Sequence, residues 1–97
     1  MIVDWDDANR SHVAEHNVST EEAEQAIVND PLDLETQEDD SDGYRYRQIG
    51  ETDVGRILVL LSTVRGNAIR VITAWDAPKA YKQFYLEQRA RQIWKRT

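Results

Sequence analysis

Residues 57–64 constrain the fold more than any other part of the chain, because they form its most continuous apolar segment. Apart from Ser62 and Thr63 they are isoleucine, leucine or valine, which is typical of a strand covered by other elements. The unbroken apolar run, residues 57–61, is far too short to cross a membrane as a helix. The segment therefore predicts a central strand of a sheet.

Strand-forming patterns lie on both sides of this segment. Residues 44–50 alternate, with Arg45 and Arg47 on one face. A tight turn at residues 65–67 leads into a β-branched segment at 69–75, and residues 32–36 are a weaker candidate strand. Short connections between consecutive strands favour antiparallel pairing. A small antiparallel sheet is therefore expected, with residues 2–5 as a short first strand or as a lead into a helix.

Three helices are predicted around the sheet. Asp6 suits the N-cap of a helix that runs to about residue 16, and Asn17 suits the left-handed residue that ends it. Ser19 and Glu22 form a capping box for a second helix. Pro78 suits the first position of a final helix that reaches about residue 94. The chain is therefore predicted to be one α+β domain, residues 1–97, with two N-terminal helices and one C-terminal helix packed on the sheet.

The absence of cysteine excludes a disulfide framework, a thiolate metal site and a thiol nucleophile. The first residues hold no basic leader followed by an apolar run, so we expect no signal peptide and no membrane association. A cysteine-free chain of this kind fits a reducing compartment. The predicted localisation is the cytoplasm.

Charge is divided unevenly along the chain, which has a net charge of −6. Residues 1–55 hold 16 acidic and three basic residues, a balance of −13, whereas residues 56–97 hold nine basic and two acidic residues, a balance of +7. Such asymmetry indicates two faces with different partners. The alternative is that both halves are ordinary solvated surface.

The acidic stretch at residues 37–43 partly matches the calcium-binding loop of an EF-hand. Glu38, Asp40, Asp42 and Gly43 occupy its positions one, three, five and six. Ile49 stands where the loop requires a bidentate glutamate. We therefore interpret the stretch as a solvated hairpin loop.

Two histidines, His12 and His16, share one helix face and could bind a metal ion together. Because no third ligand accompanies them, they do not form a zinc site. No metal and no cofactor is predicted. A histidine that titrates near neutral pH could instead act in acid–base catalysis.

Basic and aromatic side chains recur through the second half of the chain. Arginine and lysine can hold phosphates, and aromatic rings can stack on unpaired bases, as in the recognition of single-stranded RNA. The alternative, which composition alone favours, is that the aromatic residues are core and the basic residues surround it. The residues concerned are Arg45, Arg47, Arg65, Arg70, Trp75, Lys79 and Lys82.

An ordered set of short motifs covers about residues 3–85. These motifs are Trp5-Asp6, His16-Asn17-Val18-Ser19, Glu21-Glu22-Ala23, Asp30-Pro31, Gly50 and Ile69-Arg70-Val71-Ile72-Thr73-Ala74. In order and spacing the set resembles the BrnT family of ribonuclease toxins from bacterial toxin–antitoxin pairs.

The resemblance implies a RelE-like fold, metal-independent cleavage of RNA, and neutralisation by a small DNA-binding antitoxin. It implies catalysis by His16 as acid or base, with Arg47, Arg65 and Arg70 as phosphate clamps. The residues that would bind the RNA substrate are Arg45, Arg65, Trp75, Lys79 and Lys82.

The chain departs from the family pattern near the presumed site. Trp75 stands where the family usually has arginine, Asp76 follows it, and Glu15 replaces the usual lysine before the histidine. These changes predict weaker phosphate binding.

Two functions therefore stay open. One is an endoribonuclease toxin. The other is a catalytically reduced interaction domain that binds a partner, or forms a homodimer, through Tyr85, Ile93 and Trp94. Geometry separates them, because an enzyme needs His16 and the face of Arg47 and Arg70 in one concave site.

Overall fold

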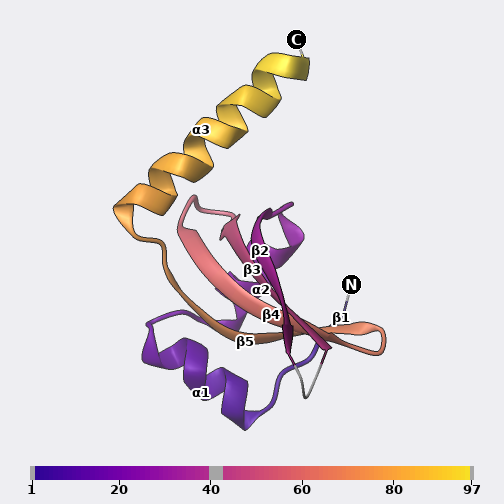
Figure 1. Ribbon diagram of the computed structural model, residues 1–97. Helices are drawn as coiled ribbons and strands as arrows, with labels where there is room; N and C mark the ends of the chain where they lie inside the picture. Colours follow the sequence, from indigo (N-terminus) through magenta and orange to yellow (C-terminus); the bar gives the residue numbers. More distant parts are fainter. Residues whose placement is uncertain (1, 40–42, 97) are drawn as a thin grey trace.

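The computed structural model describes residues 2–39 and 43–96, and within them the chain forms a five-stranded sheet and three helices (Figure 1). In chain order the elements are β1 (Ile2–Val3), α1 (Asp7–Glu15), α2 (Thr20–Val28), β2 (Leu32–Asp39), β3 (Gly43–Glu51), β4 (Ile57–Arg65), β5 (Ala68–Asp76) and α3 (Lys79–Arg96). The strand order across the sheet is β1-β5-β4-β3-β2. The predicted α+β class is confirmed.

The sheet is mixed, so the prediction of a purely antiparallel sheet is wrong. Strands β2 to β5 pair antiparallel, but β1 pairs parallel with β5, with Val3 opposite Ile69. The Asp4 amide extends this contact by donating to the Ile69 carbonyl over 2.8 Å. Parallel pairing needs a long connection between the two strands. Here two helices and three strands supply it.

The predicted central strand is confirmed in β4, which is buried on both faces of the sheet. Leu58 and Leu60 pack with α1 and α2 in the larger core cluster, whereas Val59 points to the opposite face. There it packs in a smaller cluster with Ile49, Ile57, Ala77 and Tyr85. This burial on both sides explains why the strand has no polar alternation.

The caps predicted for the first two helices are present. The Asp6 carboxylate accepts from the Asn9 amide, and Ser19 and Glu22 form the reciprocal capping box at the start of α2. Asn17 has a φ of 59°, as expected for the residue that ends α1. The buried Asn9 side chain also donates to the Asp4 and Val71 carbonyls, each over 2.9 Å, which fixes α1 against β5.

Gly50 marks a close approach between α2 and the sheet. A β-carbon placed there would lie 2.4 Å from the carbonyl oxygen of Ala26 in α2. Only glycine therefore allows α2 to lie this close to β3.

The C-terminal helix is not packed along the sheet, which corrects the prediction. Tyr85 is the one side chain of α3 that is buried among the described residues, and the helix then extends away from the sheet (Figure 1). Arg89 stacks over the Tyr85 ring and bonds the Asp30 carbonyl, so only the first half of α3 is attached. Leu86 and Ile93, 56% and 65% exposed, are on another side of the helix. None of the helices in the described segments has the length and apolarity needed to cross a membrane.

Candidate functional site around His16

His16 lies at the C-terminal end of α1, where the chain turns toward α2. Its amide donates to the Val13 carbonyl over 3.1 Å, and the left-handed Asn17 redirects the backbone. The imidazole lines an open hollow of about 600 Å³ together with Thr73, Trp75 and Asp76 of β5. The local sequence therefore places an imidazole beside β5, at the hollow.

The His16 and Trp75 rings are neighbours in this hollow. Their centroids are 6.2 Å apart and their planes are inclined by 52°. Trp75 also packs against the smaller core cluster, which holds its ring in place. An imidazole beside an indole can transfer a proton next to a surface on which an unpaired base can stack.

Asp76 lines the hollow and belongs to a network of four charged side chains whose formal charges sum to zero. Arg56, just before β4, donates to Glu22 over 3.0 Å and to Asp76 over 3.5 Å. Lys82 of α3 donates to the other oxygen of Asp76 over 2.9 Å. The negative charge of Asp76 is thus compensated by two cations. Its expected repulsion of phosphate is correspondingly reduced.

The same contacts shift the pKa values of these groups. The Lys82 ammonium, followed by Arg56, lowers the pKa of Asp76. The Ser19 backbone amide and then Arg56 lower the pKa of Glu22. Hydrogen bonding to Glu22 raises the pKa of Arg56. Asp76, Glu22 and Arg56 are therefore charged at neutral pH.

Arg56 is the residue that sequence reasoning missed. Besides its two carboxylate partners, it donates to the Asn17 carbonyl over 2.9 Å and so holds the turn directly after His16. The sequence shows that Arg56 precedes an apolar strand. It does not show the partners of Arg56, because Glu22, Asp76 and Asn17 are 34, 20 and 39 residues away along the chain.

Arg70 lies on β5 but is not among the residues that line the hollow. Its guanidinium is 2.8 Å from Asp6 and 3.8 Å from Asp4, and its side chain is 12% exposed. The hydrogen bond from Arg70 and the Asn9 amide lower the pKa of Asp6 to about 2. Five residues along a strand separate Arg70 from Trp75, roughly 16 Å. In this structure Arg70 is therefore the ion-pair partner of Asp6, the N-cap residue of α1.

The two arginines of β3 lie on the same face of the sheet as Trp75. Ile49 pairs with Val59, which pairs with Trp75, and Arg47 is two residues before Ile49. The Arg47 guanidinium is 3.3 Å from Glu35 on β2. Arg45, two residues earlier, shares this face. These side chains could extend a binding surface across the sheet from the hollow.

The remaining predicted residues lie on other elements. Arg65 is exposed at the end of β4, and Lys79 is exposed at the first residue of α3. The structure thus brings together His16, Trp75 and, through Asp76, Lys82. Arg47, Arg70 and Arg65 lie on other parts of the sheet.

No three His, Cys, Asp or Glu side chains in the described part of the chain are grouped so that they could hold a metal ion. His12 is exposed on α1. The acidic loop weighed as a calcium site falls partly on residues 40–42, which are outside the described residues.

The acidic first half and the basic second half of the chain are joined by ion pairs. Arg56 pairs with Glu22, Arg70 with Asp4 and Asp6, and Arg89 with Asp30. Some of the opposite charges of the two halves therefore neutralise each other within the folded chain.

The comparisons with known proteins give one match. A family model described as the ribonuclease toxin BrnT of type II toxin–antitoxin systems matches residues 5–80. This range includes His16, Arg56 and Asp76, and it ends as α3 begins. No curated protein and no solved structure matches the chain.

Proposed function

We propose that this chain, which belongs to the BrnT family of ribonuclease toxins from type II toxin–antitoxin systems, is the toxin of such a pair and cleaves RNA without a metal ion. The observation that carries the site assignment is the placement of His16 beside Trp75 in an open hollow within the matched range. A proton-transfer group next to a stacking surface is what RNA cleavage by the substrate's own hydroxyl requires.

In the proposed reaction a ribose 2′-hydroxyl attacks the adjacent phosphorus atom. His16 accepts the hydroxyl proton as the O2′–P bond forms. The P–O5′ bond then breaks, and the departing 5′-oxygen takes a proton from the His16 imidazolium, which leaves a 2′,3′-cyclic phosphate. Lys82, which is paired with Asp76 of the hollow, supplies the positive charge that stabilises the developing negative charge. Trp75 stacks on a base beside the scissile bond.

The arginines assigned to phosphate binding act at a distance from the hollow in this proposal. Arg47 and Arg70 bind neighbouring phosphates of the RNA strand, exchanging their carboxylate partners for phosphate oxygens. Three exposed or partly exposed cations extend this surface; they are Arg45, Arg65 and Lys79.

The proposal also includes the partner and the fold relationship that the family suggests. A small DNA-binding antitoxin neutralises the toxin in the cytoplasm. The sheet with α1 and α2 on one face is a RelE-like arrangement. Family membership supports the assignment of an antitoxin as partner. The α+β architecture is compatible with a RelE-like fold.

Controlled expression in a bacterial host tests the toxin role. Induction of the wild-type chain is expected to arrest growth and to fragment cellular RNA, and His16→Ala at equal expression is expected to do neither. His12→Ala is the matched control, because this second histidine of α1 is exposed and does not line the hollow. Normal growth with intact RNA on wild-type expression, or equal toxicity of His16→Ala, would overturn the proposal.

A non-catalytic interaction domain is the second candidate. The cancellation of charge around the hollow favours it, because both cations there are engaged by carboxylates. It predicts wild-type expression without RNA fragmentation. The same experiment therefore separates the two functions.

A further inference from the structure

One side of α3 combines aromatic and basic side chains at helical spacing. Tyr81, Phe84, Gln88, Arg91 and Lys95 follow one another every three or four residues, so they form one stripe along the helix. Tyr81 and Phe84 are 36% and 41% exposed, and Arg91 and Lys95 are exposed as well. We call these five residues the aromatic–basic stripe. None of them lines the hollow of the candidate site.

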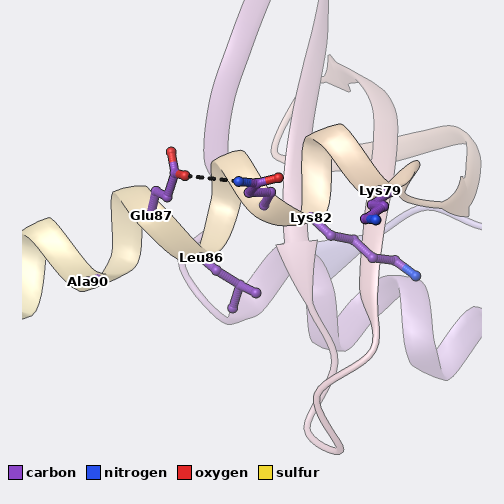
Figure 2. Close-up of a pocket in the computed structure, with 6 residues that line it drawn as sticks. Lys79, Lys82, Leu86, Glu87 and Ala90 are labelled. Atoms are coloured by element: carbon purple, nitrogen blue, oxygen red, sulfur yellow. Dashed lines mark hydrogen bonds between the residues drawn. The ribbon is translucent and has the colours of Figure 1, made fainter.

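The other sides of α3 differ from this stripe. Figure 2 shows the side that carries Lys82, Leu86 and Ala90 beside a shallow hollow of about 440 Å³. The positive charge on that side is already engaged, because Lys82 is paired with Asp76. Arg91 and Lys95, in contrast, make no hydrogen bond or ion pair with the residues that the structure describes. The stripe therefore presents uncompensated positive charge next to exposed rings.

The helix as a whole carries charge of the opposite sign to the rest of the chain. Its sequence holds six basic residues and one acidic residue, a balance of +5, whereas the other residues hold six basic and 17 acidic residues, a balance of −11. The helix extends away from the sheet (Figure 1). Arg91 and Lys95 follow the anchoring residue Tyr85 by about 9 and 15 Å along the helix axis. Because charges separated by more than about 8 Å are largely screened at physiological salt, the acidic body only weakly opposes an anion bound there.

We propose that the aromatic–basic stripe binds a single strand of RNA, as a second contact outside the hollow that contains His16. Arg91 and Lys95 hold phosphates, and the rings of Tyr81 and Phe84 stack on unpaired bases. The inference rests on the proposed function in taking RNA as the ligand. The family match does not assign this contact, because α3 lies almost wholly beyond the matched residues 5–80.

The exposed rings favour RNA over the other common polyanion, an acidic polypeptide. Either ligand can pair with Arg91 and Lys95. Only the nucleic acid also offers flat bases to Tyr81 and Phe84, and bases that are not paired in a duplex are the ones free to stack on side chains. The combination of charges and rings on one stripe is therefore matched by a single strand.

Binding of a labelled 2′-O-methyl RNA oligonucleotide to the full chain tests the proposal. The blocked 2′-hydroxyl prevents cleavage, so the affinity is measured independently of catalysis. In fluorescence anisotropy at about 0.1 M salt, Lys95→Gln is expected to bind about fivefold more weakly, with a salt slope shallower by about 0.7, as for one lost phosphate contact. Adding Arg91→Gln should double the change in slope. Arg10→Gln, which removes an exposed arginine of α1, is the matched control and should bind like the wild type.

Two further variants separate stacking from charge. Phe84→Ala is expected to weaken binding at least about fivefold with an unchanged salt slope, because stacking releases no ions. Leu86→Ala, on the opposite side of α3, is its control. Glu87→Gln should strengthen binding about twofold at low salt, since Glu87 lies one turn before Arg91 and repels phosphate. Its long hydrogen bond from Gln83, 3.4 Å, can be made by an amide as well (Figure 2).

Circular dichroism checks that each variant is folded. A wild type that does not bind the oligonucleotide, charge variants that bind like Arg10→Gln, or a Phe84→Ala variant that binds like Leu86→Ala would each overturn the proposal. Polyglutamate that binds as tightly as the RNA would overturn it in favour of an acidic polypeptide. Failure of the proposed function would be seen separately, as absent cleavage of unmodified RNA by protein that still binds the modified strand.

Discussion

Arg70 and Asp6 form an ion pair with 2.8 Å between the guanidinium and the carboxylate. The pair joins β5 to the N-cap of α1, so a residue that the family resemblance assigns to phosphate binding also holds the first helix in place. If Arg70 binds phosphate as proposed, RNA and Asp6 compete for the same guanidinium group. This competition can be measured.

Asp6→Asn is expected to increase the affinity for single-stranded RNA and to steepen its salt dependence. Asparagine caps a helix as well as aspartate does, so α1 should remain formed while Arg70 is released. One additional phosphate contact corresponds to a slope steeper by about 0.7 in a plot of log affinity against log salt concentration. Fluorescence anisotropy with a labelled oligonucleotide measures it. Asp7→Asn is the control, because it removes a neighbouring carboxylate that is not among the described ion-pair partners of Arg70, and it should leave the slope nearer the wild-type value. Equal slopes for all three proteins would contradict this prediction.

The free energy of unfolding is expected to decrease as the pH is lowered from about 5 to about 2. The pKa of Asp6 is lowered from 3.8 to about 2 in the folded chain, and those of Glu22 and Asp76 are lowered as well. A carboxyl whose folded pKa is depressed stabilises the fold above its unfolded pKa and loses this contribution as pH falls through the folded value. Urea midpoints across this pH range measure the decline. It should be shallower in Asp6→Asn, and a pH-independent wild type would contradict the account.

Arg56→Met is expected to destabilise the fold by about 1–2 kcal/mol, as for the loss of charged hydrogen bonds at a partly exposed site. It should also loosen the turn that holds His16, because Arg56 bonds the Asn17 carbonyl. Urea unfolding measures the first effect, and the NMR chemical shift of the His16 ring measures the second. Arg65→Met, which removes an exposed arginine from the end of β4, is the control. A His16 ring signal that is unchanged in Arg56→Met would argue against a positioning role.

Gly50→Ala is expected to cost about 3 kcal/mol, the upper end of what overpacking costs. The added β-carbon would lie 2.4 Å from the Ala26 carbonyl oxygen, so α2 has to move away from β3. Gly66→Ala separates this effect from backbone strain, because Gly66 has a φ of 58° and no atom within 4 Å of an added β-carbon. It should cost about 1–2 kcal/mol. Thermal or urea unfolding compares them, and equal losses would rule out the close approach as the cause.

The features that could be predicted from the sequence depend on neighbouring residues. The Asp6 cap and the Ser19–Glu22 capping box are set within one helical turn, and the burial of β4 follows from its continuous apolar residues. The two caps were predicted at the right residues because few side chains can accept hydrogen bonds from the unpaired backbone amides at the start of a helix.

The features that were missed depend on residues far apart in the chain. The parallel contact of Val3 with Ile69 requires the path of two helices and three strands, which no local pattern contains. The contact of Arg56 with Glu22 and Asp76 likewise arises only when β4, α2 and β5 are assembled. Within the described residues, Tyr85 is the one side chain of α3 that is buried against the body of the protein. Leu86 and Ile93 are also apolar but stay exposed, so composition did not indicate which side of α3 packs.

Cleavage of a single-stranded RNA by the purified chain, in the presence of a chelator, tests the central claim most directly. The account predicts products that end in a 2′,3′-cyclic phosphate, a loss of about 100-fold or more in rate for folded His16→Ala, and a wild-type rate for His12→Ala. Arg70→Ala should also lose cleavage if it binds phosphate. No cleavage by folded wild-type protein, or an undiminished rate in His16→Ala, would contradict the account.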